Sequence, residues 1–156
     1  SPTATYSGSG MNYNIYSPDN ANIYGITDGS GGTYAMYGAL NTLDRLAVKV
    51  TSANVRGIGG DFWLANAAGA TVPGLLGITV GLSDNTTANY VSPGYWAPAG
   101  KTITDLWLTN QSGNPDSYAT MDNLWVAVPE PGVIVTNALV VLGALGGAWA
   151  YRRRQS

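Results

Sequence analysis

Apolar and polar residues alternate along five short stretches of the chain. Such alternation is typical of β-strands with one buried face, because successive side chains of a strand point to opposite sides. In residues 118–128, for example, the pattern places Leu124 and Val126 on one side and Met121 and Trp125 on the other. The alternation predicts strands over residues 11–16, 46–50, 75–82, 103–108 and 118–128.

Turn-forming residues separate these stretches. They cluster as "DGSGG" from Asp28, "SDNTT" from Ser83, "APAG" from Ala97 and "SGNPD" from Ser112. Strands at roughly ten-residue spacing with such turns favour an antiparallel β-sandwich, which we predict for a domain over residues 1–128. Residues 34–46 fit either a strand with a loop or a short helical turn.

The pattern changes after a Pro-Glu-Pro linker at residues 129–131. Residues 132–151 contain no charged side chain, and the two prolines set a sharp boundary because proline disfavours helix in the residue before it. Twenty helical residues span about 30 Å, the thickness of the hydrocarbon layer of a bilayer. We therefore predict one hydrophobic C-terminal α-helix within residues 132–156, which crosses a membrane; a helix buried in a soluble core is the alternative.

The flanks of this segment predict its orientation. Three arginines, Arg152, Arg153 and Arg154, follow it directly, and positive residues tend to stay on the cytoplasmic side. The body would then face outward, at the cell surface or outside the cell. The chain opens with Ser1-Pro2 and without a charged and apolar leader, so we expect that an export signal has already been removed.

Small residues form a stripe along the predicted helix. Gly143 and Gly147 make a GxxxG pattern, which allows close approach of two helices in a membrane. The stripe predicts self-association, and many tails could bundle into the core of a filament; alternatively, Gly and Ala are simply frequent in membrane helices. The candidate helix-packing residues are Thr136, Asn137, Val140, Gly143, Gly147 and Ala150.

Three features stand in order at the C-terminus: Val128-Pro129-Glu130-Pro131, the apolar span and the arginines Arg152–Arg154. Together they resemble a PEP-CTERM sorting signal. The resemblance implies export, retention in the membrane and recognition by an exosortase, a membrane transpeptidase that processes its substrates near the Pro-Glu-Pro. Proteins with this signal are typically surface or matrix proteins of Gram-negative bacteria that make exopolysaccharide, and they are often linked to biofilm.

The body resembles the small jelly-roll-like β-sandwiches that commonly precede such a tail. The similarity lies in "GGDFWLANAAG", "LLGITVGL", "TITDLWLTN" and "YATMDNLWVAVPEP", with Asp122-Asn123 in the last strand. It implies a jelly-roll-like fold and no particular functional residue.

Composition narrows the function classes. Before Gly132 four basic residues stand against nine acidic ones, a balance of −5, so we expect no nucleic-acid partner. Only 10% of the residues are charged, well below the roughly 25% of average soluble proteins. The chain has neither Cys nor His, which removes disulfides, cysteine metal sites and the commonest general base.

These absences argue against catalysis. No histidine can activate a Ser or Thr nucleophile. A carboxylate pair could hydrolyse a glycoside, but Glu130 is the sole glutamate and lies in the sorting motif. We predict a non-enzymatic protein without a cofactor. Calcium is the one metal that the oxygen ligands would suit, with Asp19 and Asp28 as candidates, although the spacing of an EF-hand loop is missing.

Aromatic residues offer a second function. Tryptophan and tyrosine on strands can form cross-strand pairs or core, or stack on sugar rings where one face of the sheet is exposed. We therefore predict an exported structural protein that assembles with itself, with a matrix module that binds exopolysaccharide as the alternative. The candidate sugar-binding residues are Trp63, Tyr95, Trp96, Trp107 and Trp125.

Overall fold

The computed structural model describes residues 3–8, 11–19, 23–27, 33–37, 45–90 and 93–129. In these ranges the chain is mainly β, with eleven strands, no helix and antiparallel pairing throughout. The predicted β class is thus confirmed. The predicted C-terminal helix lies outside the described residues, as do all six candidate helix-packing residues.

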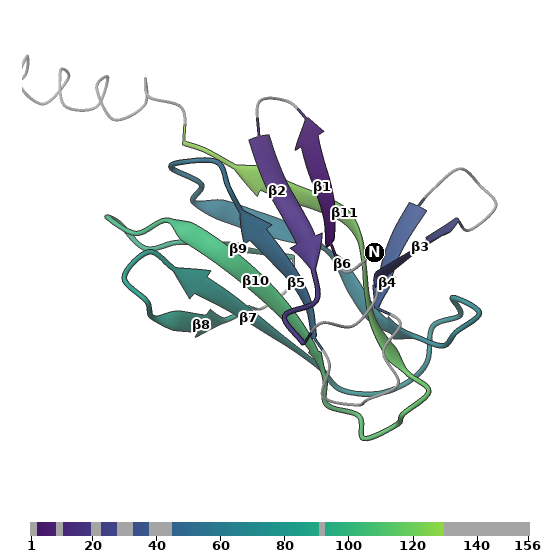
Figure 1. Ribbon diagram of the computed structural model, residues 1–156. Coiled ribbons are helices and arrows are strands. Elements are labelled where there is room, and N and C mark those ends of the chain that lie inside the picture. Colours follow the sequence, from purple (N-terminus) through teal and green to yellow (C-terminus); the bar gives the residue numbers. More distant parts are fainter. Residues whose placement is uncertain are drawn as a thin grey trace, which may run out of the picture.

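The strands form two sheets. The six-stranded sheet has the order β1 (Thr3–Gly8), β2 (Met11–Tyr16), β5 (Arg45–Val50), β10 (Ile103–Asn110), β7 (Leu76–Leu82) and β8 (Thr87–Asn89). The five-stranded sheet has the order β3 (Ile23–Thr27), β4 (Thr33–Tyr37), β11 (Tyr118–Ala127), β6 (Gly57–Ala65) and β9 (Gly94–Trp96). Figure 1 shows β2, β5, β10 and β7 side by side, with β8 at the edge.

All five strands predicted from alternation are present, with bounds within two residues. The ambiguous stretch begins as strand β4, and residues 38–44 lie outside the described part. Five further strands, β1, β3, β6, β8 and β9, were not predicted. The sequence pattern did not predict β6 because three of its first four residues are glycines, which have no side chain to contribute to an alternating pattern.

The last two strands close the fold. From β4 onward the chain passes from one sheet to the other at every step except the β7–β8 hairpin. Strand β10 then inserts between β5 and β7, and β11 inserts between β4 and β6. The strand that leads to the Pro-Glu-Pro linker is therefore an inner strand of its sheet.

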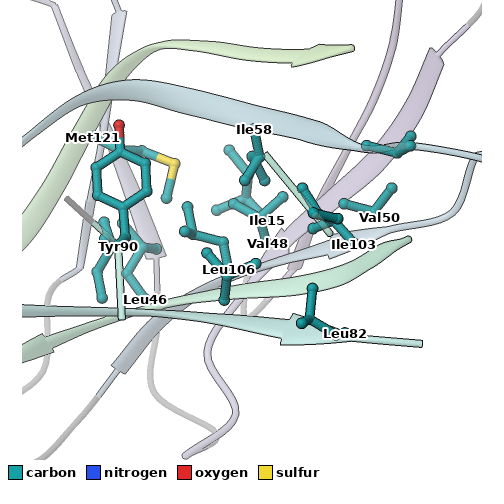
Figure 2. Close-up of a cluster of buried hydrophobic side chains, with 14 of the residues drawn as sticks. Ile15, Leu46, Val48, Val50, Ile58, Leu82, Tyr90, Ile103, Leu106 and Met121 are labelled. Atoms are coloured by element: carbon teal, nitrogen blue, oxygen red, sulfur yellow. The ribbon is translucent and has the colours of Figure 1, made fainter. Parts of the chain in front are cut away.

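Both sheets turn apolar side chains toward one shared core. Leu46, Val48 and Leu106 of the six-stranded sheet are fully buried, and so is Ile58 of the five-stranded sheet. Figure 2 shows Val48, Leu106 and Ile15 in one cluster with Ile58 and Met121 of the other sheet. Burying one such side chain contributes about 1.5–3 kcal/mol, so the interface between the sheets is the main source of stability.

A bulge in β11 corrects the predicted faces of this strand. The register against β6 shifts between Asp122 and Trp125, and Asn123 has a φ of 49°. An extra residue reverses the alternation, as bulges do. Met121 is therefore buried in the core, on the same side as Leu124, whereas the alternation alone placed the two on opposite sides. Trp125 lies on the face opposite Leu124, as predicted, and this face points away from the core.

Backbone hydrogen bonds hold the point where β11 ends. The amide of Arg56 donates to the carbonyl of Ala127 at 2.9 Å, and the amide of Ile103 donates to the carbonyl of Val55 at 2.8 Å. The end of β11 and the start of β10 therefore lie at the same end of the domain. At the opposite end the buried amide of Asn110 donates to Ser117 and so fixes the loop between these two strands.

The topology gives a test of domain independence. A chain that ends after Pro129 is expected to keep its fold, because every described contact of β11 is retained; its thermal midpoint should stay within about 4 °C of the full chain. A chain that ends after Asp116 should not fold, because it lacks an inner strand. Circular dichroism and thermal melts measure both. Unfolding of the first variant would instead mean that the C-terminal helix belongs to the core.

Candidate functional site

Two exposed tryptophans lie together on the outer face of the five-stranded sheet. Trp125 comes from β11 and Trp96 from the edge strand β9, with ring centroids 6.1 Å apart and ring planes inclined by 42°. Trp96 is 60% exposed and Trp125 37%. Only two other large hydrophobic side chains of the described residues are exposed, Leu75 and Val128, and Val128 directly follows β11. We call Trp96 and Trp125 the tryptophan platform.

Glycines form the floor under this platform. Gly59 pairs with Trp125 on one side and with Gly94 on the other, and Gly57 pairs with Trp96. A Cβ at Gly94 would lie 2.5 Å from Trp125 Cζ2, and a Cβ at Gly57 would lie 3.0 Å from Trp96 Cη2. The indoles therefore rest directly on backbone, a position that is open only because no side chain stands there.

Acidic and amide groups continue the same outer face. Asp61 lies two residues beyond Gly59 on β6 and pairs with Asp122 across the strands. Like charges in this position repel. The side chain of Asn123 donates to Asp61 Oδ2 at 2.8 Å, and its backbone amide donates to Asp122 Oδ1 at 2.7 Å, which offsets part of the repulsion. Hydrogen-bonding groups thus stand beside one end of the platform.

The other candidate sugar-binding aromatics lie elsewhere. Tyr95 pairs with Ile58 and packs against the core, so it is not part of the exposed surface. Trp63 is half-buried on β6, opposite Thr120 and four residues from Gly59. Trp107 lies on the outer face of the six-stranded sheet. Of the five predicted residues, the structure brings together only Trp96 and Trp125.

Trp107 borders a hollow of about 160 Å³ on its sheet. The β7–β8 turn forms one side of this hollow and is held by charge. Lys101 pairs with Asp84 at 2.6 Å, and the hydroxyl of Thr86 also donates to Asp84 at 2.6 Å. The Lys101 ammonium, followed by Thr86, lowers the pKa of Asp84 to about 2. The ionised Asp84 therefore stabilises the β7–β8 turn fully at pH values above its usual pKa of 3.8, and this stabilisation is lost as the pH falls toward 2.

A second hollow, of about 210 Å³, opens between Phe62 and Trp63 of β6 and Ile78 of β7. Tyr90 closes it and meets Phe62 edge to face, with ring centroids 5.4 Å apart. Burial raises the pKa of the Tyr90 hydroxyl above its usual value of 10.

Of the two calcium candidates, only Asp19 lies among the described residues. Asp19 binds Arg45 through both carboxylate oxygens, at 2.8 Å to the backbone amide and 3.0 Å to Nη2. The Arg45 side chain lowers the pKa of Asp19. Asp28 lies outside the described residues. Among those described, no three acidic side chains gather closely enough to hold a metal ion.

The described part of the sorting motif consists of Val128, which is 39% exposed, and Pro129. Glu130, Pro131 and Arg152–Arg154 lie outside it. Within the described ranges we find no helix that could span a bilayer.

Three comparisons with known proteins found no matching protein family, curated protein or solved structure.

Sequence reasoning missed the parts of the platform that carry no aromatic ring. The glycines of β6 and β9 have no side chain that could contribute to an alternating pattern, yet they define where the indoles lie. Their spacing in "GIGGDFW", with a glycine at every second position before Asp61, is a signal for a flat outer face. Asp61 and Asn123 could be placed beside the platform only from the register of β6 and β11.

The glycine floor can be tested with a double-mutant cycle. Gly59→Ala is expected to destabilise the domain by about 1–3 kcal/mol, because its Cβ would lie 2.6 Å from Trp125 Nε1 and displace the indole. In a Trp125→Ala background the same change should be neutral or stabilising, since alanine restricts the unfolded chain more than glycine. Urea unfolding of the four proteins measures the coupling. Equal costs in both backgrounds would show that Trp125 does not rest on Gly59.

Proposed function

We propose that this chain is an exported, non-enzymatic structural protein of the cell surface or extracellular matrix, sorted by a PEP-CTERM tail. The observation that carries the proposal is the junction between domain and tail. The inner strand β11 ends at Ala127, is held there by Arg56, and leads at once into Val128-Pro129-Glu130-Pro131. A tail fixed to an inner strand anchors a domain more firmly than one fixed to a fraying edge strand.

In this proposal the exosortase and the membrane are partners during sorting, and other copies of the chain are partners afterwards. Thr136, Gly143 and Gly147 would lie at the contact between tail helices, whether in the membrane or in a filament core. The body needs no cofactor and binds no nucleic acid, since its acidic balance opposes contact with phosphates. The proposed fold is a jelly-roll-like sandwich, and its support is that from β4 onward the chain crosses between the two sheets at every step except β7–β8.

A second function is favoured by the tryptophan platform: binding of exopolysaccharide. Two exposed indoles lie side by side over glycines, and the apolar face of a sugar ring can stack on such a surface. At the border, Asp61 could accept hydrogen bonds from sugar hydroxyls, and Asn123 could donate hydrogen bonds to them. The carboxylates of Asp61 and Asp122 disfavour a polymer rich in carboxylates, so a neutral polysaccharide is the expected ligand.

Sorting can be tested by intact mass. The full chain, exported by a signal peptide in a Gram-negative host that has an exosortase, should be recovered outside the cell with a mass that ends near Pro131. A strain without the enzyme should retain the full-length chain in the membrane. Leu75→Ala, an exposed change at the end of the domain opposite to where β11 ends, serves as the control and should be processed normally. Full-length protein outside both strains would contradict sorting and favour a tail that remains as a building element.

Sugar binding can be tested by tryptophan fluorescence of the full chain, titrated with dextran, hydroxyethyl cellulose and alginate. We expect a spectral change with at least one neutral polymer and a weaker one with alginate. Trp96→Ala and Trp125→Ala should each weaken binding about tenfold or more, which corresponds to about 1.4 kcal/mol. Leu75→Ala removes an equally exposed apolar side chain and should have no effect. A flat response of the unmodified protein to all three polymers would rule the function out.

A further inference from the structure

The two inner strands β10 and β11 share one feature: each has a leucine-tryptophan pair directly after a shift of register. In β10, Leu106-Trp107 follows an irregularity of register between Ile103 and Asp105; in β11, Leu124-Trp125 ends the bulge after Asp122. In both strands the leucine packs into the core, and the tryptophan lies on the outer face of its sheet. The six-stranded sheet therefore repeats, on the other side of the domain, the arrangement that forms the platform.

Trp107 also rests on a glycine. Gly81 of β7 pairs with Asp105, and a Cβ at Gly81 would lie 2.7 Å from Trp107 Cη2. The indole thus extends diagonally across the neighbouring strand. It borders the hollow of about 160 Å³ that the β7–β8 turn closes on the other side. We call this the Trp107 hollow.

Polar side chains without a described hydrogen-bond partner line the Trp107 hollow. The side chains of Asn85, Thr87 and Thr104 border it, and none of the three takes part in a hydrogen bond described for this part of the chain. Asn85 and Thr87 are exposed. Two hydroxyls and one amide are therefore available to a ligand, and each of them can both donate and accept a hydrogen bond.

The charged groups around the hollow are already paired. Asp105 is 7% exposed and accepts a hydrogen bond from Lys49 Nζ at 3.0 Å. Asp84 is paired with Lys101 in the turn. Because both carboxylates are neutralised by lysines of the same domain, the hollow favours neither a free cation nor an anion. An indole wall with hydroxyl and amide groups suits a neutral ring rich in hydroxyls.

We propose that the Trp107 hollow binds one sugar unit of a neutral polysaccharide, as a second site separate from the tryptophan platform. This inference rests on the proposed binding of polysaccharide but on different residues. Both sheets turn their inner faces to one core, so their outer faces point away from each other. One domain would then hold two polysaccharide strands on opposite sides and cross-link them.

Stoichiometry distinguishes this proposal from a single site. The full chain is titrated by isothermal calorimetry with cellohexaose, maltohexaose and N-acetylchitohexaose, and two molecules of at least one of them should bind per chain. Trp107→Ala should leave one, and the double variant Trp96→Ala with Trp125→Ala should also leave one. The triple variant should bind none. We measure stoichiometry per chain and not gelation of a polysaccharide. Chains that assemble through their tails would cross-link the polysaccharide even if each chain had only one binding site.

A second variant guards against misfolding of Trp107→Ala. Thr87→Val with Thr104→Val keeps the shape of the hollow and removes both hydroxyls, and valine suits a strand. This variant should weaken only one of the two sites, about tenfold, with an unchanged thermal midpoint. Leu75→Ala is the control and should bind like the unmodified chain.

The outcomes separate the two proposals. One bound sugar that Trp107→Ala or the threonine variant leaves unaffected, but that the platform variant abolishes, would overturn the second site and leave the platform standing. One bound sugar that is lost only in Trp107→Ala and the threonine variant would support the hollow and refute the platform. If no hexasaccharide binds to the unmodified chain, both sites are refuted.

Discussion

The structure depends on the contact between the apolar faces of its two sheets. Leu106 and Leu108 of β10 meet Ile58 of β6 and Met121 of β11 in one buried cluster. Because β10 and β11 are the last of the described strands and insert between earlier ones, this contact is complete only when the whole domain is present. Pairing of strands far apart in the sequence implies slow folding compared with a helical protein of this size.

The same contact determines what the outer faces can be. Alternation forces the residue after each core leucine outward, so burying Leu106 and Leu124 places Trp107 and Trp125 on opposite surfaces of the domain. Large exposed indoles and glycines inside strands both work against stability; a glycine in a strand costs roughly 0.5–1 kcal/mol relative to alanine. Gly57, Gly59 and Gly94 on one sheet and Gly81 on the other therefore leave room for these indoles at a cost in stability.

A strand could be predicted from the sequence where its apolar and polar side chains alternate, and not where glycines replace them. The strands β2, β5, β7, β10 and β11 were predicted because their apolar residues alternate. Strand β6 was missed because Gly57, Gly59 and Gly60 give no pattern, and β9 because three residues are too few for one. The predicted face of Met121 was wrong because the bulge arises from the pairing of β11 with β6 and is not visible in the sequence of β11 alone.

The candidate site shows the same limit. The sequence offered Trp96 and Trp125 as candidate sugar-binding aromatics together with Tyr95, Trp63 and Trp107, and it did not tell which of the five are exposed. Tyr95 immediately precedes Trp96, and only the pairing of β9 with β6 shows that one points to the core and the other outward. The glycine floor needs three strands in register, a relation that no local pattern contains. Resemblance of the tail to a sorting signal could be stated from sequence because that signal is local.

The proposed sites and the end of β11 lie at the same end of the domain. Arg56 binds the end of β11, Val55 binds the start of β10, and Thr104 at this start borders the Trp107 hollow. Trp96 pairs with Gly57, the residue next to Arg56. Both tryptophan surfaces therefore flank the point where the chain leaves the domain for Pro129. A domain held by its tail would grip polysaccharide close to its own anchor, so that a load on the polymer passes to the tail through the short end of β11 rather than across the whole sandwich.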